Sequence, residues 1–260
     1  MCAQHGNGGR TAVQQIAAFA SKAKPSHLTP EARALLKRNI LDSVGCVIAA
    51  LPGASFRALR NQFEGYRSAG SCTLIGGGTT SVEQAALYNS GLVRYVDLLD
   101  SYMSPGGLCH PGDNFSAVLA TAERVKASGQ DFLLALAVAY EVQCPFYGSR
   151  SHHVKGFNHG LQLTMPVSLA SGKLFGLTEL QIANAVLIAA VDNVSLSRVH
   201  FEPVSQWKGF SPGITAMRAV YAASLAPFNF DLPLVRHGTF AAAGLAPPRL
   251  TVVSFTETRK

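Results

Sequence analysis

Helix start and stop signals recur along most of this 260-residue chain, and they constrain its fold more than any other feature. Three starts combine a capping side chain with a first-turn proline or a Gln three residues later: Thr29-Pro30, Ser81 with Gln84, and Thr178 with Gln181. Gly129 and Gly176 each follow a stretch of helical period, where a left-handed residue ends many helices. These signals predict helices that include 11–24, 114–128 and 161–175.

The signals together predict a single all-α domain over residues 11–225, with short connections as in a packed helical bundle. Residues 1–10 are polar and Gly-rich, which is typical of a flexible N-terminus. The one clear β-like segment is 71–75, and the three glycines 76–78 that follow it predict a turn and not a phosphate loop, because no Gly-Lys-Ser/Thr follows them. Residues 226–260 have several prolines and no helical period, so we expect a divergent, disordered tail.

Composition narrows the class of protein. Hydrophobic residues make up 48% of the chain and charged residues only 14%, so we expect much of the surface to be covered by another subunit or domain, most simply in a homodimer. The net charge of +7 is scattered and has no basic cluster, which disfavours nucleic acid as a partner. A small anionic substrate agrees better with this charge.

The cysteines and the apolar stretches indicate the compartment. The five cysteines are widely spaced and form no C-x-x-C pair, so we expect reduced thiols and an intracellular, cytoplasmic protein. The most apolar stretches, 132–142 and 180–191, are too short to cross a bilayer. The region before Glu31 has basic but no acidic residues, which leaves a mitochondrial location as the alternative.

Three stretches interrupt the helical pattern and retain polar residues: 97–114, 149–159 and 195–212. The first contains Asp97, Asp100 and Ser101, followed by His110. A carboxylate facing an imidazole fixes its tautomer and raises its basicity, as a general base requires. The alternative for Asp100 and Ser101 is a local Asx or Ser turn.

Capping is the favoured interpretation for two further polar residues of the first stretch. Asp113 and Asn114 directly precede the predicted helix 114–128, where short polar side chains commonly cap free backbone donors. We therefore assign neither of them to the site.

The other two stretches contribute one candidate base and two cations. His159 precedes an apolar helix, whose free backbone donors favour an anion nearby. Lys208 lies between the only tryptophan and a glycine, and a desolvated lysine is a good partner for a substrate carboxylate. Arg198 is a further candidate for binding a carboxylate.

Several motifs, in order over residues 11–225, resemble those of the MmgE/PrpD family. One is Ala86-Leu-Tyr-Asn, then Arg94-x-x-Asp97-x-x-Asp100-Ser101 and His110-Pro-Gly-Asp-Asn. Others are Tyr140-Glu-Val-Gln with Asn158-His-Gly, and Asp192-Asn-Val with Trp207-Lys-Gly. Ser101 stands where the family commonly has threonine, and Gly112 replaces the serine of its His-Pro-Ser-Asp-Asn motif.

The resemblance implies an all-α domain that is followed, in relatives, by an α/β lid domain. The family pattern is not found after Ala226, so we expect this chain to lack the lid. By position, the resemblance places Asp97, Ser101, His110, His159 and Lys208 in the active site. Asp100 and Arg198, together with Lys208, are expected to bind substrate.

The resemblance also implies the chemistry, which is proton transfer next to a carboxylate of a small polycarboxylate, without metal or cofactor. Such a step builds negative charge, which Lys208 and one protonated histidine would stabilise while the other histidine moves the proton. A dehydratase of the 2-methylcitrate type is favoured. The alternatives are cis-aconitate decarboxylase or epimerase activity, or a non-catalytic helical module that dimerises.

Overall fold

The computed structural model describes residues 10–65, 70–104, 107–147, 156–201 and 203–228. In these residues the regular structure is helical apart from two short antiparallel strand pairs, which confirms the predicted all-α class. The α-helices are α1 (Ala12–Lys22), α2 (Pro30–Ala50), α3 (Ala54–Gly65), α4 (Val82–Tyr95), α5 (Phe115–Val125), α6 (Gly129–Tyr147), α7 (Thr164–Leu174), α8 (Glu179–Asp192) and α9 (Trp207–Leu225). The 3-10 helices are η1 (Pro25–His27), η2 (Pro111–Asn114), η4 (His159–Leu163), η5 (Ser197–His200) and η6 (Ala226–Phe228).

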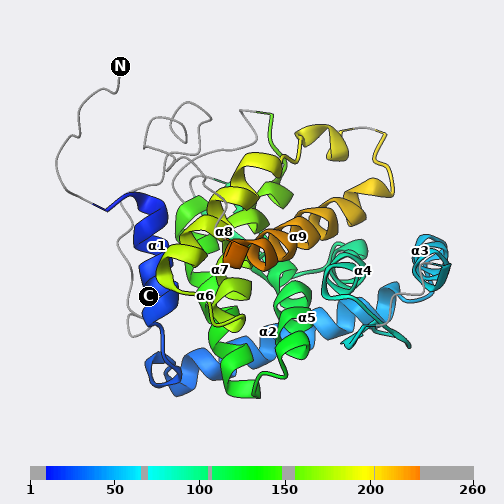
Figure 1. The fold of residues 1–260 in the computed structure, drawn as a ribbon. Helices are drawn as coiled ribbons and strands as arrows, with labels where there is room; N and C mark the ends of the chain where they lie inside the picture. Colours follow the sequence, from blue (N-terminus) through cyan, green and yellow to red (C-terminus); the bar gives the residue numbers. More distant parts are fainter. Residues whose placement is uncertain (1–9, 66–69, 105–106, 148–155, 202, 229–260) are drawn as a thin grey trace.

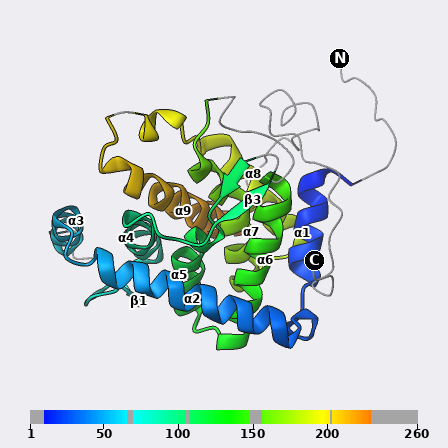
Figure 2. The same cartoon turned by 180° about the vertical axis from the view of Figure 1, so that it is seen from behind.

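The helices pack around α7, which contacts α1, α5, α6, α8 and α9. A second group forms where α4 packs against α9, α5 and α2 (Figure 1). Figure 2 shows α2 running along the lower edge of the bundle, past α5 and α6. The buried apolar side chains form several clusters: Leu136 and Leu169 belong to the one around α7, and Leu163 belongs to one that joins α4, α5, α7 and α9.

The predicted helix starts are confirmed by their caps. The Thr29 hydroxyl accepts the Ala32 N–H, with Pro30 in the first turn of α2. Thr178 and Gln181 form a reciprocal capping box at the start of α8. Ser81 caps α4 at Gln84, although the Gln84 side chain bonds Thr80 instead of completing a box.

One predicted stop is right and one is wrong. Gly176 follows α7 with φ 71°, and the Leu177 N–H bonds the Gly172 carbonyl as expected for a left-handed stop. Gly129, in contrast, begins α6. Lys126 is the left-handed residue that ends α5, with φ 54°. A capping pattern can be satisfied by a non-glycine residue where the turn geometry demands it, so the glycine was a misleading signal.

The strand pairs are small. The predicted β segment 71–75 contains β1 (Cys72–Thr73), which pairs with β2 (Thr79–Thr80) across a turn in which Gly76, Gly77 and Gly78 all have positive φ. A second pair, β3 (Tyr102–Ser104) with β4 (Gly107–Cys109), was not predicted. This hairpin lies within the polar stretch 97–114, and β4 leads directly into His110.

α4 and α9 cross closely because glycines remove the side chains between them. A Cβ on Gly213 would lie 2.6 Å from the Leu87 carbonyl oxygen, and one on Gly209 would lie 3.1 Å from the Tyr95 ring. The start of α9 is therefore held against the end of α4. This contact places Lys208, in the first turn of α9, beside the residues that follow α4.

Residues 1–9 and 229–260 lie outside the described residues. The predicted flexible N-terminus and most of the predicted disordered tail are therefore not covered by the structure. In the described part of the chain no single helix has the length and apolar composition to cross a membrane; α2 and α3 meet both conditions only when taken together as a pair bent by 89°.

Candidate active site

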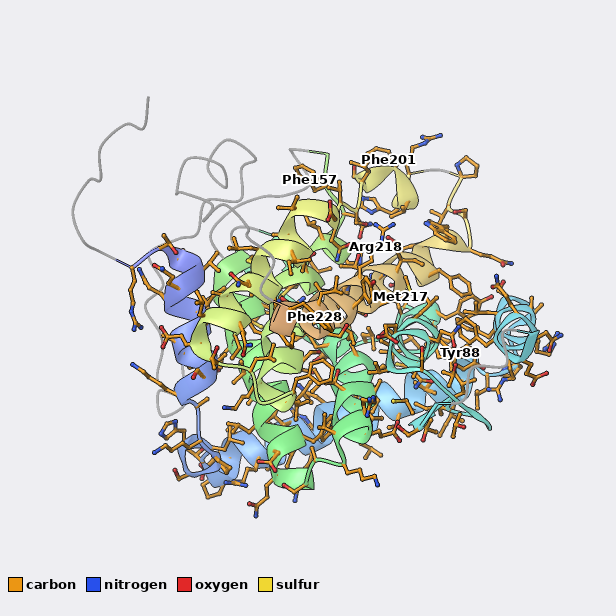
Figure 3. The ribbon with its side chains drawn as sticks, viewed as in Figure 1. Tyr88, Phe157, Phe201, Met217, Arg218 and Phe228 are labelled. Atoms are coloured by element: carbon orange, nitrogen blue, oxygen red, sulfur yellow. The ribbon has the colours of Figure 1, made fainter. Side chains whose placement is uncertain are left out.

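Two chain segments are joined by backbone hydrogen bonds so that two histidines become neighbours. The Asn158 N–H bonds the Ser195 carbonyl at 2.9 Å, and the Ser197 N–H bonds the Gly156 carbonyl at 2.8 Å. His159 and His200 follow these contacts, and their rings stack with centroids 6.2 Å apart. Phe157 and Phe201, labelled in Figure 3, lie at the same end of the molecule.

His110 contacts the first of these two histidines, His159. Its ring and that of His159 meet edge to face, with centroids 5.4 Å apart. The expectation that these two residues lie close enough to contact one small molecule is therefore met by the geometry. Their catalytic roles remain predictions.

The His110 imidazole has a fixed tautomer. Nδ1 lies 3.0 Å from the Asp100 carbonyl oxygen and 3.3 Å from the Ser101 hydroxyl. A carbonyl oxygen can only accept, so Nδ1 carries the proton and Nε2 presents its lone pair. Burial and the positive charge of Arg94 lower the pKa of His110 to about 4. The ring is thus neutral near pH 7 and can accept a proton at Nε2.

Asp100 holds this arrangement from within the protein. Its carboxylate accepts the Gly112 N–H at 2.7 Å, the Tyr140 hydroxyl at 2.9 Å and the Asn39 amide at 3.2 Å. Burial raises the pKa of Asp100. Both oxygens accept hydrogen bonds within the protein, and the contact of Asp100 with substrate remains a prediction. The alternative of a local Asx turn is not supported, because all three donors lie at least twelve residues away in the sequence.

Gly112, which stands where the family motif has serine, leaves space beside the Asp100 carboxylate. A Cβ at this position would lie 2.7 Å from the Asp100 Oδ1 atom and 3.2 Å from the Ser43 hydroxyl. The missing side chain lets the Gly112 N–H approach the carboxylate directly. His110 remains in place.

Arg94 lies at the centre of the site, and the sequence analysis gave it no role. Its side chain is only 2% exposed, and its Nη2 atom lies 2.7 Å from His159 Nε2 and 3.2 Å from Asp97 Oδ1. Its Nη1 atom lies 3.8 Å from Asp113 Oδ2. Its position in the Arg94-x-x-Asp97 motif was the sequence signal that could have identified it.

Asp97 and Lys208 form the outer part of the site. Lys208 Nζ lies 2.6 Å from Asp97 Oδ2, and the two side chains are 30% and 45% exposed. Burial acts to raise the pKa of Asp97, but the hydrogen bond from Lys208 and the charge of Arg94 outweigh it and lower the pKa. Asp97 has φ 57°, a left-handed conformation that aspartate tolerates and that lets its carboxylate reach both cations.

The capping roles predicted for Asp113 and Asn114 are wrong. Both side chains are buried, and the Asn114 amide donates to the Pro111 carbonyl and to Gln143. The Asn114 side chain makes no capping bond. The 3-10 turn η2 directs both side chains inwards, where Asp113 faces Arg94. Burial raises the pKa of Asp113 to about 7, against the lowering effect of Arg94.

The geometry adds an arginine to the charges that we expected at the site. Burial and Arg94 lower the pKa of His110, and Arg94 Nη2 lies 2.7 Å from His159 Nε2, so the protonated histidine that we expected remains a prediction. The buried cation is Arg94. Arg198 is exposed on η5, and its guanidinium forms no ion pair with any described residue, so its predicted contact with substrate remains a prediction.

His200 is a second residue to which the sequence analysis gave no role. The Asn158 Oδ1 atom accepts the Gly160 N–H, which orients the amide so that Nδ2 donates to His200 Nδ1 at 2.8 Å. Nδ1 is then the acceptor, so His200 carries its proton on Nε2 when neutral. Its sequence signal was its position in the stretch 195–212, together with Lys208.

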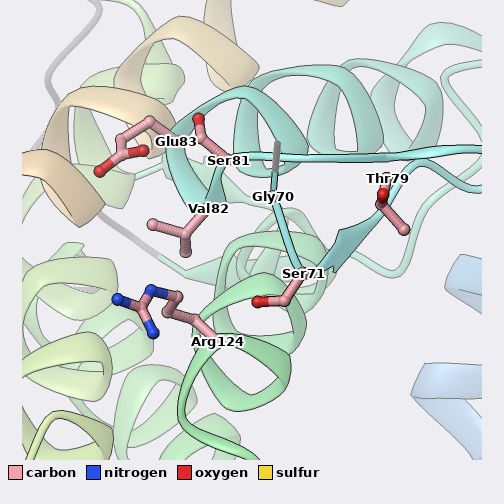
Figure 4. Close-up of a pocket in the computed structure, with 7 residues that line it drawn as sticks. All are labelled: Gly70, Ser71, Thr79, Ser81, Val82, Glu83 and Arg124. Carbon is pink, nitrogen blue, oxygen red and sulfur yellow. The ribbon is translucent and has the colours of Figure 1, made fainter. Parts of the chain in front are cut away.

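A surface pocket of about 680 Å³ lies elsewhere. It is lined by Gly70, Ser71, Thr79, Ser81, Val82, Glu83 and Arg124 (Figure 4). This lining is at the start of α4, whereas the histidines gather at the end of α4, and none of the candidate residues lines it. In the described part of the chain no group of three or more His, Cys, Asp or Glu side chains is arranged to hold a metal ion.

Comparison with known proteins identifies the relatives. The chain is 27% identical to 2-methylcitrate dehydratase of Escherichia coli K12 over 200 residues, which is 72% of this chain and 41% of that protein. It is 27% identical to alkylcitrate dehydratase phiI of a fungal species, over 81% of this chain and 44% of that protein. It is 26% identical to the cis-aconitate decarboxylase-like protein oryM of Aspergillus oryzae, over 72% of this chain and 41% of that protein.

The chain therefore spans about two fifths of the length of these relatives. The match to the family itself covers more of the chain, since the MmgE/PrpD N-terminal domain matches residues 14–233. That range contains every candidate site residue and extends a few residues past the predicted domain end at 225. The chain belongs to the MmgE/PrpD family, through that family's helical N-terminal domain.

Proposed function

We propose that this chain forms the substrate-binding part of a hydro-lyase that removes water from a small polycarboxylate of the 2-methylcitrate type. The observation that supports it most is that three groups lie at the same helix ends: His110, whose Nε2 atom carries no proton, and the two cations Arg94 and Lys208. Dehydratase names among the relatives favour the same class of reaction.

The arrangement suits elimination next to a carboxylate. His110 Nε2 takes the proton from the carbon beside a carboxylate as the carbon–carbon double bond forms. The protonated imidazole then gives that proton to the departing hydroxyl group, which leaves as water, so the histidine returns to its neutral form. Negative charge grows on the substrate carboxylate during the first half of the step, and fixed cations stabilise it.

Lys208 is the cation with access to solvent. Its pairing with Asp97 is half-exposed, so an incoming carboxylate competes with Asp97 for the ammonium group. Ser101, beside His110, offers a hydroxyl group to the same substrate. Asp97 is thus the partner that Lys208 exchanges for the substrate, and Ser101 is the corresponding partner of His110.

The test is a dehydration assay on the purified chain with 2-methylcitrate, in which the product is followed by the ultraviolet absorbance of its conjugated double bond and identified by NMR. His110→Gln is expected to lower the rate at least about 100-fold, the low end of the contribution of a positioned base. The exposed His27 provides the matched control, since His27→Gln keeps the rate unchanged. A chain that neither binds nor dehydrates the substrate contradicts the proposal.

One alternative reaction has a specific observation behind it. The similarity to a cis-aconitate decarboxylase-like protein favours loss of carbon dioxide, which the same NMR assay distinguishes from loss of water. Epimerase activity would leave the substrate formula unchanged. A chain that binds 2-methylcitrate without converting it would favour the other alternative, a non-catalytic helical module.

We also propose that the chain forms a homodimer. α2 exposes three large aliphatic side chains, Leu35, Leu41 and Ile48, which are 47%, 72% and 60% exposed. Apolar surface of this kind favours association. Light scattering at micromolar concentration is expected to give twice the chain mass, and a monomer would contradict it.

A further inference from the structure

The hydrogen bond between Arg94 and His159 determines where His159 carries its proton. Arg94 Nη2 lies 2.7 Å from His159 Nε2. A guanidinium group has five donors and no acceptor, and it stays protonated in proteins. His159 Nε2 must therefore accept, so it holds a lone pair and the ring proton is on Nδ1.

Arg94 cannot easily turn away from this contact. Its side chain is 2% exposed and lies between the carboxylates of Asp97, at 3.2 Å, and Asp113, at 3.8 Å. Asp113 is itself only 2% exposed, so the guanidinium is held from the protein interior as well as from the surface. Burial and the contacts of Nη2 with Asp97 and His159 therefore restrict the direction of the guanidinium, with Asp113 as an ion-pair partner that makes no hydrogen bond.

The backbone around His159 is equally fixed. Asn158 precedes it, and its Oδ1 atom accepts the Gly160 N–H at 2.6 Å, which closes a tight turn around the histidine. The ring lies between those of His110 and His200. A half-turn of the imidazole about its Cβ–Cγ bond would put a ring carbon in the place of Nε2 and so break the bond to Arg94.

We propose that Arg94 is a positioning residue that fixes His159 as the neutral Nδ1–H tautomer, so that His159 offers the substrate a hydrogen-bond donor while His110 offers an acceptor. The two neighbouring histidines then have opposite tautomers. His110 has its proton on Nδ1, bonded to the Asp100 carbonyl, and presents the lone pair of Nε2. His159 has the lone pair of Nε2 bonded to Arg94 and carries its proton on Nδ1.

This division assigns different tasks to residues of the same type. A neutral imidazole that donates a hydrogen bond can polarise a substrate oxygen without competing for the proton that His110 removes. The part of the inference that concerns substrate rests on the proposed function. The tautomer itself does not, because it follows from hydrogen bonds within the protein.

Long-range ¹H–¹⁵N correlation NMR of the imidazole rings tests the inference on the full chain, without substrate. His159 is expected to show a protonated Nδ1 and an unprotonated Nε2 at neutral pH. A wild-type spectrum with His159 protonated on Nε2, or on both nitrogens, would overturn the inference. This reading requires no variant, so it does not depend on whether a variant folds.

Two variants then identify the cause. Arg94→Met keeps a similar volume and removes the donor, and it is expected to release His159 to the other tautomer or to a mixture of both. Arg94→Lys keeps a donor and is expected to restore the wild-type pattern at least in part. Arg60→Met is the matched control, because Arg60 bonds Tyr88 and backbone carbonyls but no histidine. An unchanged His159 spectrum in folded Arg94→Met would refute the role of Arg94.

The dehydration assay separates this inference from the proposed function. Turnover by a wild-type chain whose His159 is protonated on Nε2 would leave the function standing and reject the tautomer assignment. The expected tautomer in a chain that does not turn over 2-methylcitrate would reject the function and leave the role of Arg94 intact.

Discussion

The stability of the chain should depend on pH through His110 in a way that one substitution can isolate. His110 is 8% exposed, and its pKa falls from 6.5 to about 4 because of burial and the charge of Arg94. A histidine with a depressed pKa in the folded state contributes stability that is present above pH 6.5 and is lost as the pH falls towards 4. In that window the unfolded chain binds the proton and the folded chain does not.

The size of the effect follows from the two pKa values. Between pH 7.5 and pH 5 the loss attributable to His110 is about 2 kcal/mol, because each pKa unit corresponds to about 1.4 kcal/mol and most of the window is crossed by pH 5. Other charged groups face this ring, namely Arg94, Asp97 and Lys208. Asp97 and the backbone of Asp100 raise the pKa of His110, whereas Arg94 and Lys208 lower it.

Asp113 would obscure the effect in wild-type protein alone. Its pKa is raised from 3.8 to about 7, so the folded chain binds this proton more tightly than the unfolded chain and gains stability as the pH falls through the same range. The two contributions have opposite signs. A comparison of variants is therefore required, and a single pH profile is not sufficient.

The assay is urea unfolding of wild type and His110→Gln at pH 7.5 and pH 5. The difference in unfolding free energy between the two proteins is expected to shift by about 2 kcal/mol towards the variant at the lower pH, since glutamine does not titrate. His27→Gln, at an exposed site, is the control and should keep a constant difference. A constant difference for His110→Gln as well would refute the reasoning that burial and Arg94 keep this ring neutral.

Three further predictions concern packing, the internal anchor and the exposed cation. Gly213→Ala is expected to cost about 1–3 kcal/mol, because its Cβ would meet a backbone oxygen at 2.6 Å, whereas Gly45→Ala, with open space, should be neutral or stabilising in thermal unfolding. Asp100→Ala should cost about 2–3 kcal/mol in urea unfolding, since it leaves buried donors unpaired, and a loss below 0.5 kcal/mol would contradict its role as an anchor. Lys208→Met should weaken binding of 2-methylcitrate at least about tenfold in calorimetry while the helical circular dichroism is retained, and unchanged affinity would exclude Lys208 from the binding site.

Sequence periodicity and capping residues were sufficient to predict the helical fold class, because a helix start depends on residues that are only three or four positions apart. Thr178 with Gln181 is an example, and the structure forms the predicted box. The helix stop at Gly129 was misplaced because a left-handed turn depends on the local backbone and not on glycine alone, and Lys126 adopted it. The hairpin of β3 and β4 could not be predicted, since three-residue strands have too short a pattern.

The sequence pointed to the loop residues of the candidate site and missed the arginine of helix α4. His110, His159 and Lys208 were selected because polar residues in loops stand out against apolar helices. Arg94 was missed although its motif was visible, because on sequence alone a helical arginine is usually solvated. Its role depends on tertiary contacts with Asp113 and His159, nineteen and 65 residues away in sequence, as the ion pair and the hydrogen bond show.

The most direct test of the account is to titrate the ¹⁵N-labelled chain with 2-methylcitrate and follow the imidazole signals. The account predicts that His110 Nε2 and His159 Nδ1 shift together along one saturable binding curve, while exposed His27 does not move. Lys208→Met should weaken that same curve. Saturable binding that leaves His110 and His159 unshifted, or no binding at all, would contradict the claim that these helix ends form one polycarboxylate site.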